Sequence, residues 1–272
     1  MIEYYDIIFL FLAGCLAGTI SGLLGVGGGI INVAILTYYF ERLHVSDIEL
    51  TRFVLSNSFL AIFFSSLFGS FQQIRMKNFF LKEVLLTTVT TISLSFTFSF
   101  LIIHFDWYSK GRFSLFFISI LAALIIKMIW SIRNKKNTEF LDNISSRHFI
   151  ITGIFTGIFS ALSGLGGGVV TVPILSDIHR LKIKKATSIS LGVMPLMALF
   201  NIIAYSLQQS SSITQVAIGY IKPDITLPLV AGVMIFAPLG VRLAAKLSEI
   251  TIRIIFVVVV SLVIIRMFFS IL

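Results

Sequence analysis

Long apolar stretches, separated by short polar or charged segments, follow one another along the whole chain. Because a helix crosses the hydrocarbon core of a bilayer with about 20 apolar residues, stretches of this length predict membrane helices. Backbone groups in lipid must also bond within their own segment, which favours helices over open strands. The chain contains eight such stretches, at residues 7–40, 53–71, 79–105, 113–132, 149–175, 186–207, 225–245 and 252–272.

Composition supports an all-α integral membrane protein. Of the 272 residues, 57% are hydrophobic and 12% charged, and the mean hydropathy is +1.01, which is too apolar for a soluble domain. The formal net charge is +9. Its Lys and Arg residues lie in short connections between apolar stretches, so we assign them to membrane topology and expect a lipid bilayer, not nucleic acid, as the partner.

The sequence contains no motif that indicates a metal site or an enzyme active site. Cys15 is the only cysteine, so disulfides within the chain and cysteine-based metal sites are excluded. The four histidines are scattered without the spacing of metal ligands, and no HExxH or paired acidic motif indicates an intramembrane enzyme. We therefore expect no cofactor, no metal and no catalytic residues.

One glycine-rich segment occurs twice. "SGLLGVGGGIINVAIL" at residues 21–36 returns as "SALSGLGGGVVTVPIL" at 160–175, and a shift of 139 positions aligns residues 12–36 with 151–175 at 11 of 25 positions. Six of these identities are glycines, which apolar composition alone does not explain. The sequence thus predicts two homologous membrane repeats, at 1–134 and 148–272, joined by a polar linker at 135–147.

The distribution of basic residues predicts how the repeats are related. If all eight stretches crossed once, the two faces would carry eleven and ten Lys and Arg residues, and the repeats would be parallel. If the two glycine-bearing stretches instead enter and return, the count becomes fifteen against six, as the positive-inside rule expects. We therefore predict inverted repeats, each with one glycine-broken or re-entrant element and three transmembrane helices, and both termini on the outer side.

The glycine clusters predict a binding site. A glycine inside a helix costs about 1 kcal/mol relative to alanine, so a cluster breaks the helix. At membrane depth the freed N–H and C=O groups must be buried in protein or face water. The half-helices after the breaks would point their N-termini inward, which favours an anion in a shared pocket. The glycines of this site are Gly25, Gly27, Gly28, Gly29, Gly164, Gly166, Gly167 and Gly168.

Polar side chains near the breaks extend the candidate site. The hydroxyl and amide groups expected to complete it belong to Ser21, Asn32, Ser160, Ser163 and Thr171. Four more polar residues, in other apolar stretches, need either a helix–helix hydrogen bond or a substrate contact: Asn57, Thr187, Ser188 and Asn201. Glu83 and Asp224 near helix starts are ordinary interfacial acids by default, and are candidates for proton coupling if they face a cavity.

Some glycines have a simpler explanation. Gly14 and Gly18, and likewise Gly153 and Gly157, are spaced four apart, as expected for close helix packing. Consecutive triplets are different, because packing needs one glycine per turn. "GVGGG" also lacks the context of a dinucleotide fingerprint, and no GK[ST] follows to make a phosphate-binding loop.

The segments "GLLGVGGGIINVAIL", "GLGGGVVTVPIL" and "KKATSISLG" resemble the sulfite exporter TauE/SafE family of membrane permeases. The resemblance implies a multi-pass permease of the bacterial cytoplasmic membrane that moves a small anion such as sulfite or an organosulfonate. Residues 49–58, "ELTRFVLSNS", lack the Ala-Thr-Ser pattern of 186–188, and Ala34 stands where the second copy has Pro173. An anion channel, another organic anion, a cation, a coupling proton or sodium ion, and a homodimer are left open.

Overall fold

The computed structural model describes residues 4–133, 141, 144–210 and 217–269. Most of these residues are helical, and a short π-helical turn, η1 (Ile174–Ile178), continues α7. The α-helices are α1 (Tyr4–Leu24), α2 (Gly29–Arg42), α3 (Asp47–Arg75), α4 (Leu81–His104), α5 (Lys110–Arg133), α6 (Ser146–Ser163), α7 (Gly168–Pro173), α8 (Ile183–Ser206), α9 (Pro223–Lys246) and α10 (Glu249–Phe269).

The predicted all-helical membrane architecture is confirmed. Each stretch without a glycine cluster forms one helix, and each stretch with a cluster forms two, α1 with α2 and α6 with α7. Among the described residues, five helices are long and apolar enough to cross a membrane, namely α1, α3, α4, α8 and α9.

The two helix breaks have the same backbone conformation. Gly25, Gly27 and Gly28 have φ values of 69°, 76° and 74°, and the glycines 139 positions later, Gly164, Gly166 and Gly167, have 67°, 80° and 75°. This left-handed region is open to glycine at little cost and strains other residues. The repeat in the sequence is therefore also a repeat in the backbone.

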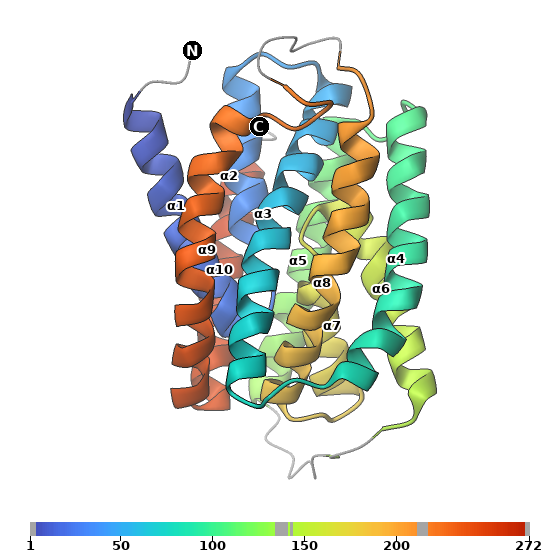
Figure 1. The fold of residues 1–272 in the computed structure, drawn as a ribbon, viewed down its shortest axis with the longest axis vertical. Coiled ribbons are helices and arrows are strands. Elements are labelled where there is room, and N and C mark those ends of the chain that lie inside the picture. The colour runs from blue at the N-terminus through green and yellow to red at the C-terminus, as the bar shows by residue number, and fades with distance from the viewer. Residues whose placement is uncertain (1–3, 134–140, 142–143, 211–216, 270–272) are drawn as a thin grey trace.

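Corresponding helices of the two halves run in opposite directions along the long axis (Figure 1). The helix α1 starts at the end that holds both chain ends, here called the termini end, and α2 returns to it. The helix α6 starts at the opposite end, the linker end, and α7 returns there. This course agrees with the predicted inverted repeat, while the membrane face that each end meets stays a prediction.

Small residues let specific helix pairs approach closely. A Cβ on Gly14 or Gly18 of α1 would lie 2.1 Å from the Leu229 oxygen or 2.8 Å from the Val233 Cα of α9. Gly153 and Gly157 bring α6 against α4 in the same way, with Gly157 packed on the Thr91 carbonyl. The predicted packing role of these four glycines is confirmed.

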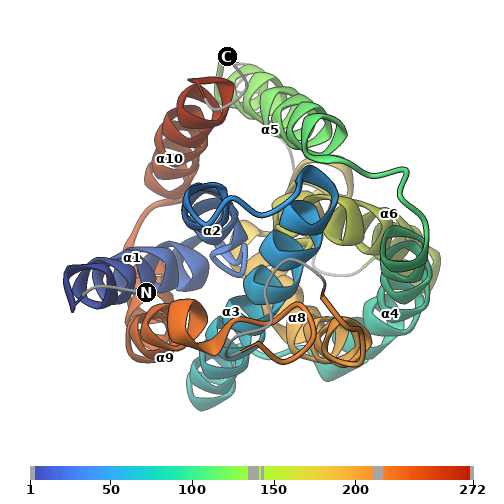
Figure 2. The same cartoon turned by 90° about the horizontal axis from the view of Figure 1, so that it is seen from above.

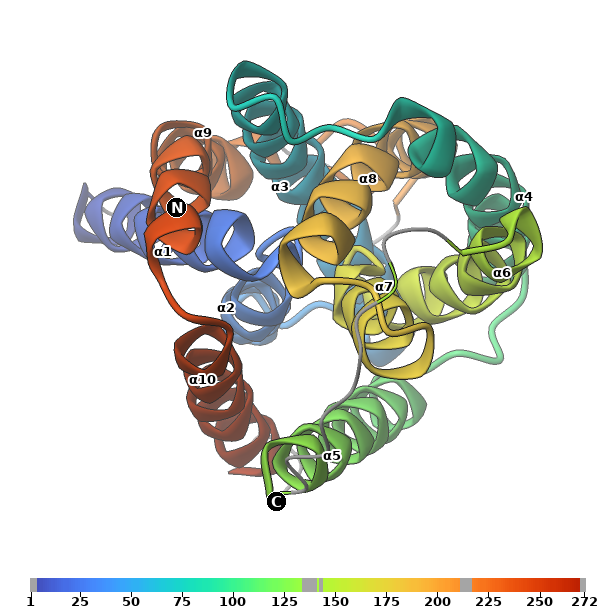
Figure 3. The ribbon, with the colours of Figure 1, turned by 90° about the horizontal axis from the view of Figure 1, so that it is seen from below.

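The pairs α1–α9 and α4–α6 lie on opposite sides of a centre that contains α3 and α8 (Figure 2). The helices α5 and α10 contact each other at the periphery, as the view from the linker end shows (Figure 3). The broken elements thus reach into the protein interior, where α3 and α8 cover them.

Candidate functional site

The two breaks touch each other in the interior. A Cβ on Gly29 would lie 2.5 Å from the carbonyl oxygen of Leu165, and one on Gly168 would lie 2.4 Å from that of Gly25. No other residue type fits at either position without moving backbone. The sequence predicts a water-filled pocket between the breaks, whereas this structure packs them directly against each other, because glycines without Cβ atoms allow the two backbones to meet.

Each break is contacted by a helix of the other half. Leu55 of α3 lies against Gly164, and Thr187 of α8 lies against Gly25. In the same way Ile62 of α3 packs on Gly166, while Met194 of α8 packs on Gly27. Leu55 and Thr187 are 132 positions apart in the sequence, and so are Ile62 and Met194. The repeat therefore extends from the breaks to α3 and α8.

Serine hydroxyls on these covering helices donate to the carbonyl groups of the breaks. Ser58 of α3 donates to the Gly164 oxygen at 2.7 Å, and Ser190 of α8 donates to the Gly25 oxygen at 2.7 Å. Sequence reasoning missed both residues. The sequence does contain a shared pattern, Ser-x-Ser at residues 56–58 and 188–190. It becomes visible only when α3 and α8 are aligned with an offset of 132 positions instead of the 139 that aligns the breaks.

The first break has a second carbonyl that is capped by a serine. Ser65 donates to the Gly27 oxygen at 2.8 Å, and the candidate residue Ser21 donates to Ser65 at 3.2 Å. In the second half Met197 takes the place of Ser65, and the candidate Ser160 contacts its sulfur at 2.9 Å. Ser21 and Ser160 therefore connect the broken elements to α3 and α8.

The backbone amides of the breaks differ from the carbonyls. Leu165 donates to the hydroxyl of Ser163, a candidate residue, at 3.2 Å. Within the described chain, the N–H groups of residues 27–29 and 166–168 have no hydrogen-bond partner. All six glycines are buried. Each break therefore presents three adjacent buried amide hydrogens at the start of α2 or α7.

Asn32 and Thr171 occupy the same place in the first turn after each break. Thr171 is satisfied, because it donates to the Gly167 oxygen at 3.0 Å and shares a hydrogen bond with Thr156 at 2.7 Å. Asn32 is fully buried, and both its amide nitrogen and its amide oxygen lack partners in the described structure. A buried amide without partners is costly and uncommon. Asn32 is therefore the side chain of the candidate set with most unused binding capacity.

The remaining candidates divide into two groups. Thr187 contacts the first break directly, since a Cβ on Gly25 would lie 2.7 Å from its Cβ. Ser188 donates instead to the Asn78 carbonyl, and Asn201 donates to Ser95 at 2.8 Å. Asn57 accepts from the Lys222 amide at 2.8 Å and so anchors the start of α9. The hydrogen bonds of these three residues lead away from the breaks.

The two acidic candidates for proton coupling form ion pairs at helix starts. Glu83 lies 3.2 Å from Lys185, and Asp224 lies 2.9 Å from Lys222. Neither pair includes a residue of the glycine breaks. Their arrangement matches the default interpretation of interfacial acids.

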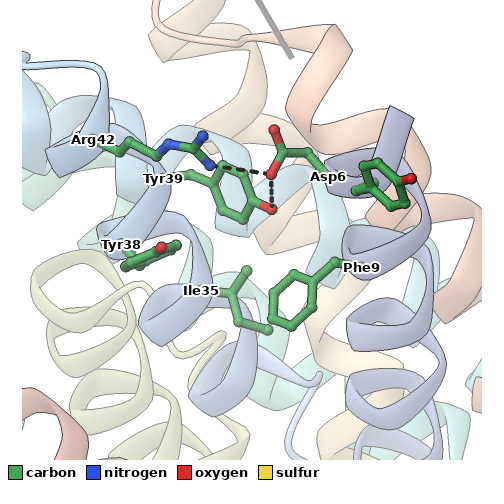
Figure 4. Close-up of a pocket in the computed structure, with 7 residues that line it drawn as sticks. Asp6, Phe9, Ile35, Tyr38, Tyr39 and Arg42 are labelled. Carbon is green, nitrogen blue, oxygen red and sulfur yellow. Dashed lines mark hydrogen bonds and ion pairs between the residues drawn. The ribbon is translucent and has the colours of Figure 1, made fainter. Parts of the chain in front are cut away.

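A cavity lies at the open mouth of each broken element. The first, about 460 Å³, lies between α1 and α2 at the termini end (Figure 4). The second, about 450 Å³, lies between the start of α6 and the end of η1. The shift of 139 positions relates four lining pairs, which are Tyr5 and Ile144, Asp6 and Ser145, Phe9 and His148, and Tyr39 and Ile178.

Comparison with known proteins identifies the family of the chain. Residues 10–267 match the sequence model of the family described as "Sulfite exporter TauE/SafE". The chain belongs to this family. It is accordingly a multi-pass membrane transporter, and the TauE/SafE resemblance of the glycine segments is confirmed.

Individual TauE/SafE relatives agree. A probable membrane transporter protein of Methanocaldococcus jannaschii is 28% identical over 252 residues, covering 90% of this chain and 89% of the relative. One from Haemophilus influenzae is 26% identical over 265 residues, covering 96% and 98%. Another protein of that organism is 23% identical over 208 residues, covering 74% and 73%. No solved structure matches the chain.

Proposed function

We propose that this TauE/SafE transporter moves a small oxyanion, sulfite or an organosulfonate, across the bacterial cytoplasmic membrane. In the proposed mechanism the amide hydrogens of residues 27–29 and 166–168 bind the anion. The support comes from the family description, which names sulfite, and from the chemistry of the two breaks. Sulfite and sulfonates carry several acceptor oxygens, so they match donor groups grouped on a backbone.

The observation that carries the proposal is the contrast between amides and carbonyls. Carbonyl oxygens of the breaks already accept hydrogen bonds from serine hydroxyls: that of Gly25 from Ser190, that of Gly27 from Ser65, and that of Gly164 from Ser58. A cation needs such oxygens, whereas an anion needs the N–H groups, which have no partner within the described chain. Because hydroxyl groups cap part of the carbonyl oxygens, while the N–H groups of both breaks have no partner within the described chain, the pattern favours an anion over a sodium ion.

Transport also requires movement of the two breaks. Because Gly29 contacts Leu165 and Gly168 contacts Gly25, no anion fits between them in this state. In the proposed cycle the broken elements separate to admit the anion, and the inverted halves open toward opposite ends in turn. Asn32 is the side chain that we place beside the bound anion, because its amide has no partner to lose within the described structure.

We further propose that the termini end faces outward. The described loops and helix ends at the linker end carry Arg75, Lys77, Arg180, Lys182 and Lys246. The termini end has fewer basic residues, among them Arg42 and Lys110. The positive-inside rule then puts the linker end in the cytoplasm.

Flux into liposomes tests the function. Purified wild-type protein should move sulfite down its concentration gradient and, when a coupling gradient is applied, also against it. A channel would carry sulfite only down its gradient. Gly167→Val should abolish flux, because a Cβ there lies 2.4 Å from Thr156 and φ is +75°. The matched control is Gly111→Val, whose added Cβ meets nothing within 4 Å.

Three results would overturn the proposal. One is normal sulfite flux in Gly167→Val, and another is wild-type flux of sodium without any anion. A third is the absence of flux and binding for sulfite and sulfonates alike in wild-type protein that remains folded. Insertion and monodispersity of each variant are measured in parallel, so that loss of transport is separated from loss of fold.

A further inference from the structure

The cavity between α1 and α2 has the lining of an amphiphile site. It is lined by Tyr5, Asp6 and Phe9 of α1 and by Ile35, Tyr38, Tyr39 and Arg42 of α2. None of these residues belongs to a glycine break. They lie in the first two turns of α1 and from Ile35 onward in α2, whereas the breaks are buried. The cavity is thus separate from the proposed anion site.

Polar and apolar groups are segregated along the cavity. Its outer part holds Asp6, which accepts a hydrogen bond from Tyr39 at 3.0 Å and from Arg42 at 3.2 Å. Its deeper part is formed by Phe9 and Ile35, which lie below the ion pair in Figure 4. A ligand that fits this order has a polar head at the end of the helices and an apolar tail toward the membrane centre.

The cavity is also open to the surroundings of the protein. Tyr5, Phe9 and Tyr38 are 80%, 53% and 49% exposed. In a membrane protein, aromatic side chains near a helix end typically lie at the level of the lipid headgroups. The molecules that reach this surface in greatest number are therefore phospholipids.

The charges near the cavity mouth balance. Asp6 pairs with Arg42, and the neighbouring Glu41 pairs with Lys110 at 3.3 Å. Among the described residues these two ion pairs balance, so a headgroup with net charge gains little from them. The Arg42 side chain is 54% exposed, and its bond to Asp6 uses one terminal nitrogen, which leaves N–H groups for a phosphate.

We propose that this cavity binds one zwitterionic phospholipid. Its phosphate accepts hydrogen bonds from the Arg42 guanidinium, which Asp6 and Tyr39 hold in place, and one acyl chain lies against Phe9 and Ile35. The lipid occupies the mouth between the two limbs of the first broken element. The cavity at the mouth of the second element has a different lining, with His148, His179 and Arg180, and the proposal does not extend to it.

Lipid competition tests this site in the full chain. Wild-type protein and variants are placed in nanodiscs containing equal amounts of phosphatidylethanolamine and phosphatidylglycerol, extracted into detergent, and the retained lipids are counted by native mass spectrometry. Arg42→Gln removes the phosphate ligand, and Ile35→Trp fills the apolar part without changing charge. Arg112→Gln is the matched control, because it removes an arginine whose contact is with the Trp107 carbonyl and which does not line the cavity.

The wild type should retain one phosphatidylethanolamine in preference to phosphatidylglycerol. Arg42→Gln should lower that retention about threefold to tenfold, as expected for loss of one half-exposed charged contact. Ile35→Trp should also lower it, because it fills the space of the acyl chain, whereas Arg112→Gln should not. Retention of phosphatidylglycerol instead, equal retention of both lipids, or unchanged retention in both cavity variants would overturn the proposal. Because lipid retention is measured without sulfite, failure here leaves the transport proposal unaffected.

Discussion

The clearest test of the anion site is the substitution Asn32→Leu. Asn32 is fully buried in the first turn of α2, and neither atom of its amide has a hydrogen-bond partner in the described structure. Leucine has a similar branched shape but no polar atom. If the amide is kept for the substrate, its removal should stabilise the protein and weaken transport at the same time.

The size of the stability effect follows from the burial of the amide. An unsatisfied buried polar group costs about 1–3 kcal/mol. Leucine is larger than asparagine, and extra volume in a packed interior costs at least about 1 kcal/mol. The net gain should be about 0–2 kcal/mol, which corresponds to a rise in melting temperature of up to a few degrees.

The transport effect should be opposite in sign. Loss of one hydrogen bond from the amide N–H to an anion, worth about 1.5–3 kcal/mol, lowers substrate affinity roughly tenfold to 150-fold. Asn32→Leu should therefore show a raised KM for sulfite in liposomes, together with a higher melting temperature in detergent. Both measurements are made on the same purified sample.

Asn57→Leu is the matched control, since Asn57 is equally buried but fully hydrogen-bonded. Its replacement leaves the Lys222 amide without its acceptor at the start of α9 and should lower stability by about 1–3 kcal/mol. The reasoning about Asn32 is refuted if Asn32→Leu is destabilised as much as Asn57→Leu, or if it is stabilised and transports sulfite with an unchanged KM.

Two further predictions concern stability. Gly18→Ala should destabilise the protein by about 1–3 kcal/mol, because the new Cβ would lie 2.8 Å from the Val233 Cα of α9, while Gly111→Ala in open space should not; equal melting temperatures would contradict the packing role. Tyr108, between α4 and α5, donates to the Leu162 carbonyl at 2.5 Å, and burial raises the pKa of its phenol above the usual 10.0. The stability that the neutral phenol contributes is fully present below pH 10 and is lost as the pH rises, because the unfolded chain ionises more readily than the folded one. Tyr108→Phe should therefore be less stable than wild type at pH 8, and the difference should shrink by pH 10.5. A difference in melting temperature that stays constant with pH would contradict this.

Several features of the site could not be read from the sequence. The offset between the halves is 139 positions at the breaks and 132 at α3 and α8, so one alignment could not reveal both. Ser58 and Ser190 were therefore not among the predicted site residues, although each caps a carbonyl of the opposite half. Asn57, one of the predicted site residues, accepts a hydrogen bond from the Lys222 amide and so anchors the start of α9.

The sequence by itself determined the helical membrane class, the duplication and the two breaks. These depend on local properties, since apolar length sets the spans and only glycine adopts repeated positive φ values at little cost. Tertiary structure alone decided which helix covers which break, which hydroxyls cap its carbonyls, and that the breaks touch. The contacts of Ser58 with Gly164 and of Ser190 with Gly25 join residues 106 and 165 positions apart, so no local sequence pattern could predict that these residues meet.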